Sequence, residues 1–204
     1  MSKSKPSLTN KNLLRARRLL IVVIDLLNNN NIPYHLEGGA LLGIVRDKDL
    51  LPWDNDVDIS IPLEYAGAVL KLRTNLFWKG YKISIRKSVK DVGPIKRGQY
   101  SILKVKPLLG YVLYWFLPNY NKHLIIMDIF TKTKDNTHSY WQAKEKVMRV
   151  ENKYYESFET IEYRGHTLRV PNHYRDYITQ KYGDWSIPVK DWDCGENELT
   201  IVKE

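Results

Sequence analysis

Three aspartates stand at alternate positions in the stretch Trp53-Asp54-Asn55-Asp56-Val57-Asp58-Ile59-Ser60-Ile61. Successive side chains of a β-strand point to opposite faces, so Asp54, Asp56 and Asp58 are predicted to share one face. Aspartate has a poor strand propensity, and like charges in a row repel each other. A cation on that face would explain the pattern, and oxygen ligands suit Mg²⁺, or alternatively Mn²⁺, better than zinc. The stretch therefore predicts a metal-dependent phosphate enzyme.

The composition sets limits on the class of protein. The chain has 204 residues, of which 43% are hydrophobic, and this is enough for one domain with its own core. The single cysteine, Cys194, excludes an intramolecular disulfide and a cysteine-rich zinc module, and it fits a reducing, cytoplasmic location. The net charge of +9 indicates an anionic partner such as nucleic acid, an anionic lipid surface, a phosphorylated glycan or a nucleotide. A merely soluble basic surface would carry the same charge.

The hydrophobic pattern predicts an α/β (α+β) domain with helices packed on a mixed sheet. The apolar run Leu19–Leu27 resembles a signal peptide, but Asp25 interrupts it, and we expect a buried helix there instead. We treat residues 1–204 as one domain with three parts: a first helix over about 10–29, a catalytic core over about 33–130 and a C-terminal helical part over about 141–204. Further helices are predicted over 63–76, 142–158 and 172–182, and strands over 34–37, 54–61, 81–86, 100–105, 124–130, 160–163 and 167–170.

Around the aspartates lies a longer motif. It begins at Gly38-Gly39, continues through Leu41-Leu42-Gly43-Ile44-Val45-Arg46 and ends in Pro52-Trp53-Asp54-Asn55-Asp56-Val57-Asp58. This order resembles the signature of the LicD/fukutin family, a branch of the nucleotidyltransferase-fold superfamily. A second stretch, Lys181-Tyr182-Gly183-Asp184-Trp185, is similar to the family's C-terminal tail. The resemblance implies a nucleotidyltransferase-like mixed β-sheet flanked by helices.

The resemblance also implies a reaction, namely Mg²⁺-dependent transfer of a phospho-alcohol from a CDP-activated donor to a hydroxyl. Known members of the family transfer phosphocholine or ribitol phosphate, and glycerol phosphate is a further candidate. The expected acceptor is an anionic cell-surface glycan, a lipopolysaccharide or a teichoic-acid-like polymer. Such transfers depend mainly on positioning and charge neutralisation, which the aspartates and a bound metal would supply.

Two alternatives stay open at this point. One is a nucleotidyltransferase that places a nucleoside monophosphate on a small molecule, and the other is a basic nucleic-acid-binding module. An acidic strand face would repel a phosphate backbone unless a metal ion were bound, and the chain has no basic and aromatic nucleic-acid motif. We therefore expect no nucleic-acid partner.

Three residues are expected to carry the metal and the catalysis. Asp56 and Asp58 would hold the metal, and the resemblance implies a third carboxylate on a neighbouring strand. Asp128 is the candidate, because it is the only charge in the apolar stretch 124–130, where burial without a partner is costly. It could also accept the proton of the acceptor hydroxyl. The alternative role for Asp128 is a structural pair with a buried lysine or arginine.

The residues expected to bind substrate are Glu37, Gly38, Gly39, Arg46 and Asp54. The glycines would let the backbone approach a phosphate at a helix N-terminus. Arg46 would clamp a phosphate or form a salt bridge with a neighbouring aspartate, and Asp54 would orient the metal ligands. Glu37 would contact a donor hydroxyl or cap the following helix.

Two segments have no clear place in this scheme. The stretch 108–118 is apolar and aromatic, and it could be a core element, a lid over the donor, or a dip into a membrane interface. The last reading leaves open peripheral association with the inner face of a membrane. An acidic cluster near the C-terminus is expected to be a solvated tail, and it consists of Asp191, Asp193, Glu196 and Glu198.

Overall fold

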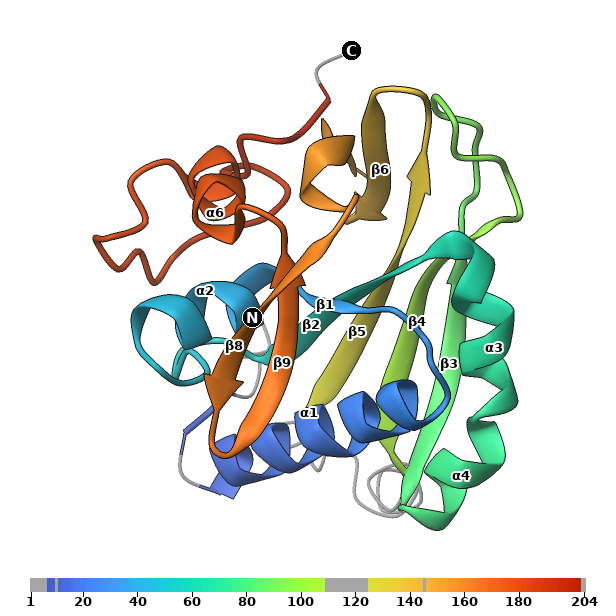
Figure 1. Ribbon diagram of the computed structural model, residues 1–204, viewed down its shortest axis with the longest axis vertical. Coiled ribbons are helices and arrows are strands. Elements are labelled where there is room, and N and C mark those ends of the chain that lie inside the picture. Colours follow the sequence, from blue (N-terminus) through green and yellow to red (C-terminus); the bar gives the residue numbers. More distant parts are fainter. Residues whose placement is uncertain (1–6, 10, 109–124, 145, 203–204) are drawn as a thin grey trace, which may run out of the picture.

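A mixed β-sheet forms the centre of the computed structural model, which describes residues 7–9, 11–108, 125–144 and 146–202 (Figure 1). Along its main path the strands follow the order β1-β2-β5-β4-β3, and β6 and β7 extend it from β5. β2 and β5 pair in parallel, whereas the other neighbours are antiparallel. The strands are His35–Leu36 (β1), Asp56–Pro62 (β2), Tyr81–Lys87 (β3), Tyr100–Pro107 (β4), Ile126–Lys134 (β5), His138–Ala143 (β6) and Lys146–Glu151 (β7). The predicted mixed sheet flanked by helices is confirmed.

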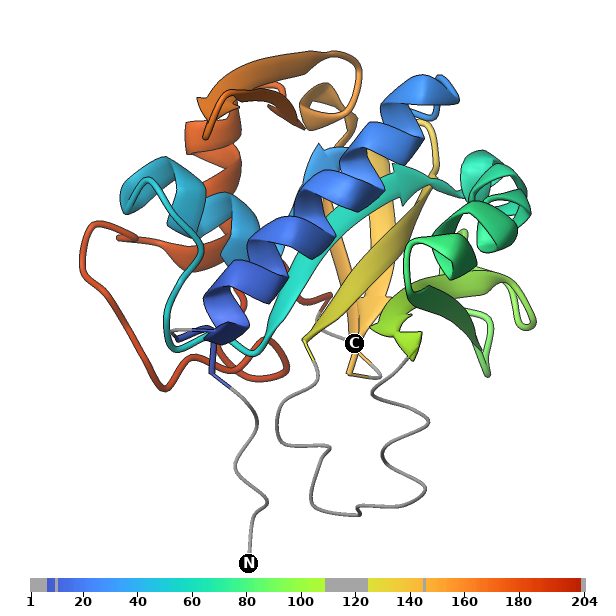
Figure 2. The ribbon, with the colours of Figure 1, turned by 90° about the horizontal axis from the view of Figure 1, so that it is seen from below.

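Helices cover one face of this sheet (Figures 1 and 2). The first, Lys11–Asn29 (α1), crosses the strands, and its buried positions recur at helical spacing, as the sequence predicts for a buried helix. Beside β3 lie a 3₁₀ turn, Leu63–Tyr65 (η1), and the helices Ala66–Lys71 (α3) and Arg73–Trp78 (α4). The single helix predicted over 63–76 is thus interrupted at Leu72, where the backbone leaves the helical region with ψ of 5°.

The C-terminal part joins this core through a second, two-stranded sheet. Its strands, Phe158–Tyr163 (β8) and His166–Pro171 (β9), form the predicted hairpin. The following helix, Tyr174–Tyr182 (α6), is the one α-helix that the structure describes after residue 146. Gly38–Arg46 (α2) lies next to β2.

The helix predicted over 142–158 is wrong. The chain forms the hairpin β6–β7 there, followed by a 3₁₀ turn at Asn152–Tyr154 (η3). Helix-forming residues dominate the local sequence, but pairing with β5 buries Trp141, Met148 and Val150 in the core. Tertiary burial therefore overrides the local propensity.

The other strands agree with the predicted ones to within a few residues. The strand expected over 54–61 begins at Asp56, so Asp54 precedes it and its face is not fixed by strand alternation. The apolar stretch 108–118, predicted as a core element, a lid or a membrane contact, lies outside the described residues apart from Leu108. In the part of the chain that the structure describes, no helix is long and apolar enough to cross a membrane.

Candidate active site

The parallel pairing of β2 with β5 brings the predicted carboxylates together. Asp58 lies directly opposite Asp128 in the register, and Asp56 lies two residues earlier on the same face of β2. One carboxylate oxygen from each of the three lies within 4.8 Å of the others. The structure thus assembles Asp56, Asp58 and Asp128 into one acidic cluster, called the aspartate cluster below.

Asp128 makes two different contacts with its two oxygens. It is 6% exposed, and its Oδ2 accepts a hydrogen bond from Lys104, its register partner on β4. Its Oδ1 is buried and has no hydrogen-bond partner among the described residues. A buried carboxylate oxygen without a donor is costly, and a metal ion coordinated there would remove that cost. Both the pairing with lysine and the metal-ligand role expected from the sequence are therefore compatible with this one side chain.

Electrostatics at Asp58 point the same way. Burial raises the pKa of Asp58 well above its usual range, and the neighbouring charges of Asp56, Asp54 and Asp128 raise it further. The ionised form is thus disfavoured in the absence of a cation. An all-oxygen donor set with this excess of negative charge fits a divalent ion such as Mg²⁺ or Mn²⁺.

The two glycines make room for these carboxylates. Gly38 has φ of +53°, and a Cβ atom there would lie 2.4 Å from Asp58 Oδ2. At Gly39 a Cβ atom would lie 1.9 Å from Asp54 Oδ2. Both distances are impossible for real side chains, so the glycines allow the start of α2 to approach the aspartates. The backbone N–H groups at this helix start remain the expected contacts for a phosphate.

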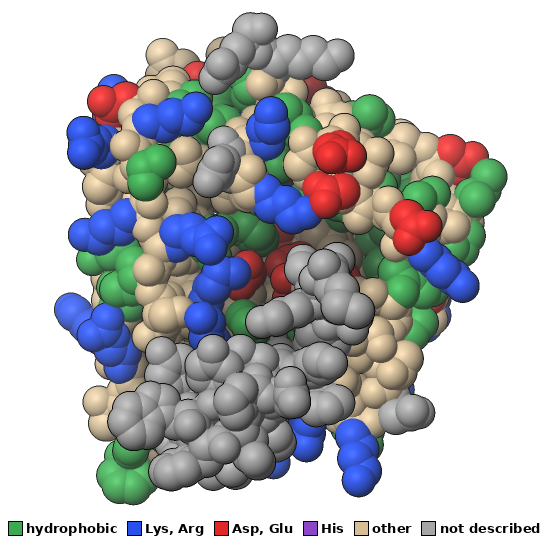
Figure 3. All heavy atoms as spheres, turned by 180° about the vertical axis from the view of Figure 1, so that it is seen from behind, with side chains coloured by type: hydrophobic (Ala, Val, Ile, Leu, Met, Phe, Trp, Pro, Cys, Tyr) green, Lys and Arg blue, Asp and Glu red, His purple; other side chains and the backbone are tan. Residues whose placement is uncertain are grey.

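The aspartate cluster lines a pocket of about 360 Å³ on the sheet face opposite α1. Figure 3 shows acidic side chains in a hollow of this face, with basic side chains beside them. Arg86 and Lys104 contribute positive charge from β3 and β4, and Lys190 and Lys144, which is paired with Asp193, also line the pocket. The pocket therefore presents a cluster of carboxylates and several basic side chains side by side.

Arg46 lines this pocket, but its guanidinium is already engaged. Its Nε donates to Asp47 Oδ1 at 2.7 Å, and its Nη1 donates to the carbonyl of Trp185 at 3.2 Å. The salt bridge to a neighbouring aspartate, one of the two roles expected for Arg46, is therefore present. The second contact ties α2 to the C-terminal segment on the pocket wall.

Glu37 begins a buried charge network behind the aspartates. Its side chain caps α2 by accepting from the Gly38 N–H at 3.2 Å, which is one of its two predicted roles. Lys132 and Lys181 each lie 2.8 Å from its carboxylate, and the Tyr177 hydroxyl donates to it at 2.5 Å. Burial alone would raise the pKa of Glu37, but the two ammonium groups outweigh it and hold the pKa well below its usual range.

The network extends into the C-terminal segment and corrects one prediction. Glu198 was expected in a solvated tail, but it is 6% exposed, and its Oε1 lies 3.1 Å from Lys181 Nζ. Thr200 donates a further hydrogen bond to Glu198. Lys132 also lies 3.1 Å from the centroid of the Trp141 ring. We call the set Glu37, Lys132, Lys181 and Glu198 the lysine–glutamate network.

Several residues of the site were not found from the sequence. Three basic residues on strands belong to no sequence motif, namely Lys104, Lys132 and Arg86. Only the pairing of their strands in the sheet brings them to the pocket or to its base. Lys181 lies in the C-terminal stretch that resembles the family tail, which was the one available signal. Its contact with Glu37 spans 144 residues of sequence.

Comparison with known proteins identifies the family. The sequence model described as LicD/FKTN/FKRP, nucleotidyltransferase domain, matches residues 31–173, which include the whole aspartate cluster. The chain belongs to the LicD/FKTN/FKRP family. The match covers both glycines and the strand β5, and it ends just before α6.

Curated relatives have low sequence identity to this family member. Ribitol 5-phosphate transferase FKRP of Mus musculus is 26% identical over 164 residues, which make up 79% of this chain and 30% of the relative. Ribitol-5-phosphate transferase FKTN of Homo sapiens is 27% identical over 183 residues, or 87% of this chain and 34% of the relative. The chain thus spans about a third of the length of the curated relatives it matches.

Among solved structures, the lincomycin-bound lincosamide antibiotic adenylyltransferase LnuA matches with a TM-score of 0.46 and 16% identity. The match covers 79% of this chain and 83% of that chain.

Proposed function

We propose that the protein is a transferase that moves a phospho-alcohol from a CDP-activated donor to a hydroxyl of a glycan or polymer. The observation that carries the proposal is the aspartate cluster of Asp56, Asp58 and Asp128 in a member of the LicD/FKTN/FKRP family. Relatives named ribitol 5-phosphate transferases support the reaction class. Ribitol phosphate is accordingly the first donor group to test, ahead of phosphocholine and glycerol phosphate.

Asp56, Asp58 and Asp128 would hold Mg²⁺, with Mn²⁺ as a substitute. A bound divalent ion would neutralise charge on the donor diphosphate and on the transferred phosphoryl group. The excess of negative charge at Asp58 and the buried Oδ1 of Asp128 support this assignment.

The other groups of the pocket bind and orient the substrates. Lys104 and Arg86 stand on the strands next to the aspartate cluster, where their charges would stabilise the diphosphate. Gly38 and Gly39 allow the backbone N–H groups of α2 to approach the same phosphates. Asp54 borders Gly39 and would orient rather than ligate.

The transfer itself exchanges one P–O bond for another. The acceptor hydroxyl oxygen attacks the phosphorus that carries the alcohol, and the bond from that phosphorus to CMP breaks. The hydroxyl proton passes to a carboxylate, for which Asp128 is the candidate because its side chain belongs to the aspartate cluster. CMP leaves with the electron pair of the broken bond.

The acceptor is expected to be an anionic glycan or polymer. The net charge of +9 supports an anionic partner, and the pocket lining includes the basic side chains of Arg86, Lys104 and Lys190. Nucleic acid is not expected as a partner, because the sequence has no basic and aromatic nucleic-acid motif.

A donor screen tests the proposal. The protein is incubated with CDP-ribitol, CDP-choline, CDP-glycerol or CTP, in Mg²⁺ or in EDTA, and CMP and pyrophosphate are followed. Metal-dependent CMP release from one CDP-alcohol, lost in Asp58→Asn, would support the reaction class and identify the donor. Pyrophosphate from CTP would instead support nucleotidyl transfer, the alternative consistent with the family's domain description. Absence of nucleotide-dependent thermal stabilisation with all four compounds would contradict both reactions.

A further inference from the structure

Two aromatic side chains project from the end of α4 into solvent. Trp78 is 81% exposed and Phe77 is 50% exposed, and their rings meet edge to face with centroids 5.6 Å apart. Single exposed apolar residues are common, but two adjacent large rings form a patch that usually marks an interaction surface. Neither ring lines the pocket. The patch is therefore separate from the aspartate cluster.

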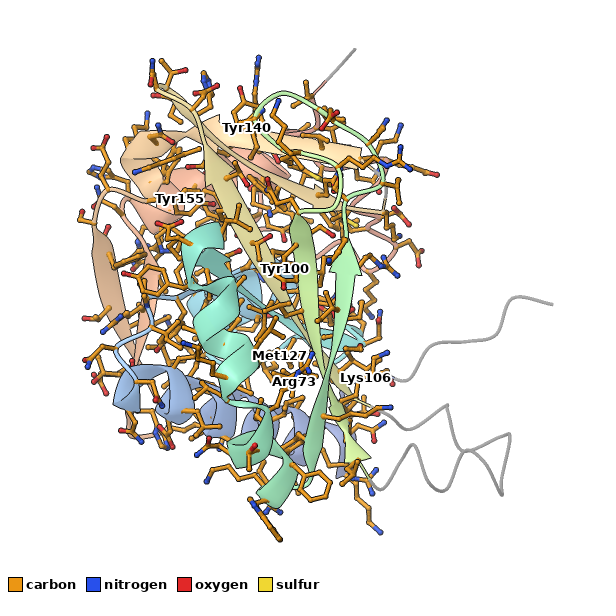
Figure 4. All side chains as sticks on the ribbon, turned by 90° about the vertical axis from the view of Figure 1, so that its right-hand side faces the viewer. Arg73, Tyr100, Lys106, Met127, Tyr140 and Tyr155 are labelled. Atoms are coloured by element: carbon orange, nitrogen blue, oxygen red, sulfur yellow. The ribbon has the colours of Figure 1, made fainter. Side chains whose placement is uncertain are left out.

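Positive charge surrounds this pair. Lys71, Arg73 and Lys79 are exposed on α3, on α4 and directly after α4. The sequence from residue 65 to residue 90 contains seven lysines and arginines and no aspartate or glutamate. Figure 4 views the molecule from the side that carries α3, α4 and β3, and it labels Arg73 on α4 and Lys106 on β4. An exposed aromatic pair within a one-sided basic surface matches the interface of an anionic lipid bilayer in both apolarity and charge.

Strand β4 ends beside this pair of rings. The Leu108 N–H donates to the Gly80 carbonyl at 2.8 Å, so the end of β4 lies next to the turn that follows α4.

We propose that the surface formed by Lys71, Arg73, Phe77, Trp78 and Lys79, called the α4 surface, docks on an anionic phospholipid bilayer. The two rings would enter the headgroup region, where aromatic side chains prefer to lie, and the three cations would face the anionic headgroups. Docking through α4 leaves the pocket open to its substrates, because the α4 surface contributes none of the described lining residues. The proposal goes beyond the transfer reaction and does not depend on it.

Vesicle co-sedimentation of the full chain tests the α4 surface. Vesicles of pure phosphatidylcholine are compared with an equal mixture of phosphatidylcholine and phosphatidylglycerol, at low and at high salt. The protein is expected to bind the anionic vesicles and to be released by salt. Each basic residue near the surface contributes about a fivefold change, so Lys71→Gln/Arg73→Gln/Lys79→Gln should weaken binding about 100-fold. Trp78→Ala should weaken it roughly tenfold.

Matched variants serve as controls. Leu199→Ala removes an apolar side chain that is 66% exposed elsewhere, and Lys146→Gln/Arg149→Gln/Arg175→Gln removes three exposed charges from β7 and α6. Both controls should bind vesicles like the wild type, and every variant should keep the wild-type unfolding midpoint. CMP release from a soluble donor should also be unchanged in the α4 variants.

Three results would overturn the proposal. Equal vesicle binding by the wild type and by both α4 variants would exclude this surface as the contact. Equal binding to neutral and anionic vesicles would remove the role of charge. The third result would come from sedimentation velocity without vesicles. If the wild type forms an oligomer that dissociates in Trp78→Ala, the patch is a protein–protein interface instead.

Discussion

Two groups of carboxylates lie side by side in this protein, one fully buried and one half-buried, and the charges around them are opposite. The Glu37 N–H donates to the Asp58 carbonyl at 3.0 Å, so the lysine–glutamate network touches the strand that carries the aspartate cluster. In the network, ammonium groups hold the pKa of Glu37 well below its usual range. In the cluster, burial and neighbouring carboxylates raise the pKa of Asp58 well above it.

From these opposite surroundings we expect a structural role for the lysine–glutamate network and a functional role for the aspartate cluster. The lysine–glutamate network neutralises its own charge, and it fastens α6 and the C-terminal segment to the base of the pocket. The aspartate cluster keeps an excess of negative charge that the described residues do not neutralise at Asp128 Oδ1. Loss of a charge should therefore destabilise the fold in the first group, and should mainly remove activity in the second.

The largest expected effect concerns activity. Asp58→Asn should lower the rate of CMP release by about 1,000-fold, because the negative charge on the transferred phosphoryl group loses its stabilisation in the transition state. The apo protein should be as stable as the wild type or more stable, since one repelling charge is gone. Steady-state kinetics and urea unfolding measure the two quantities. Asp25→Asn, the same change on the exposed surface of α1, is the control. Full activity in Asp58→Asn would contradict a functional role for the aspartate cluster.

The largest effect on stability is expected in the network. Lys181→Met should lower the free energy of unfolding by about 3–5 kcal/mol, because it leaves Glu37 and Glu198 buried without their shared cation. Urea unfolding in EDTA gives the value. Lys153→Met removes a partner from an exposed ion pair and should change stability by less than about 1 kcal/mol. Similar losses in both variants would show that the network is not a special source of stability.

The pH dependence of stability should show whether water is excluded from the region around the lysine–glutamate network. Burial lowers the pKa of His35, which stacks on Tyr155, to about 4. Between pH 6.5 and pH 4 the unfolded chain binds a proton there that the folded chain does not, so stability falls as the pH falls. Between pH 7 and pH 5 this amounts to about 2 kcal/mol, calculated from the two pKa values.

The His35→Gln variant provides the control for this pH effect, because glutamine does not titrate. Its stability should decline less between pH 7 and pH 5 than that of the wild type, by about the same 2 kcal/mol. The comparison uses the slope against pH and not the absolute stability, which the substitution will also change. Identical slopes would mean that His35 titrates normally and that this region is open to water.

The smallest expected effect tests one hydroxyl of the network. Tyr177→Phe removes the hydrogen bond to Glu37 and the one that Tyr177 accepts from Tyr155, and it should cost about 1 kcal/mol. Tyr174→Phe, at the start of the same helix, is a suitable comparison, because the Tyr174 hydroxyl makes no hydrogen bond with the described residues. A change of CMP release without a change of stability in Tyr177→Phe would move this residue from the structural to the functional group.

The sequence predicted the functional group better than the structural one. Asp56 and Asp58 were visible through strand alternation, and Asp128 was visible as a lone charge in an apolar strand. The network depends on contacts such as Glu37 with Lys181, which are distant in sequence and follow no local pattern. The same limit explains why Glu198 was expected in solvent and is buried instead.

Secondary structure shows the same division. The strands β2 and β5 and the helix α1 have clear periodic patterns, and they were predicted to within a few residues. The hairpin β6–β7 was predicted as a helix, because its charged residues favour a helix locally while its burial is decided by pairing with β5. Local sequence thus predicted the carboxylates that the fold brings together and missed part of what holds them in place.

The central claim is that the aspartate cluster binds a divalent ion. The most direct measurement is an anomalous difference map from crystals grown with Mn²⁺, recorded for the wild type and for Asp58→Asn. The account predicts a strong peak between Asp56, Asp58 and Asp128 in the wild type, with weaker or no density in the variant. A wild-type map without a peak at these carboxylates, in Mn²⁺ well above millimolar concentration, would contradict it.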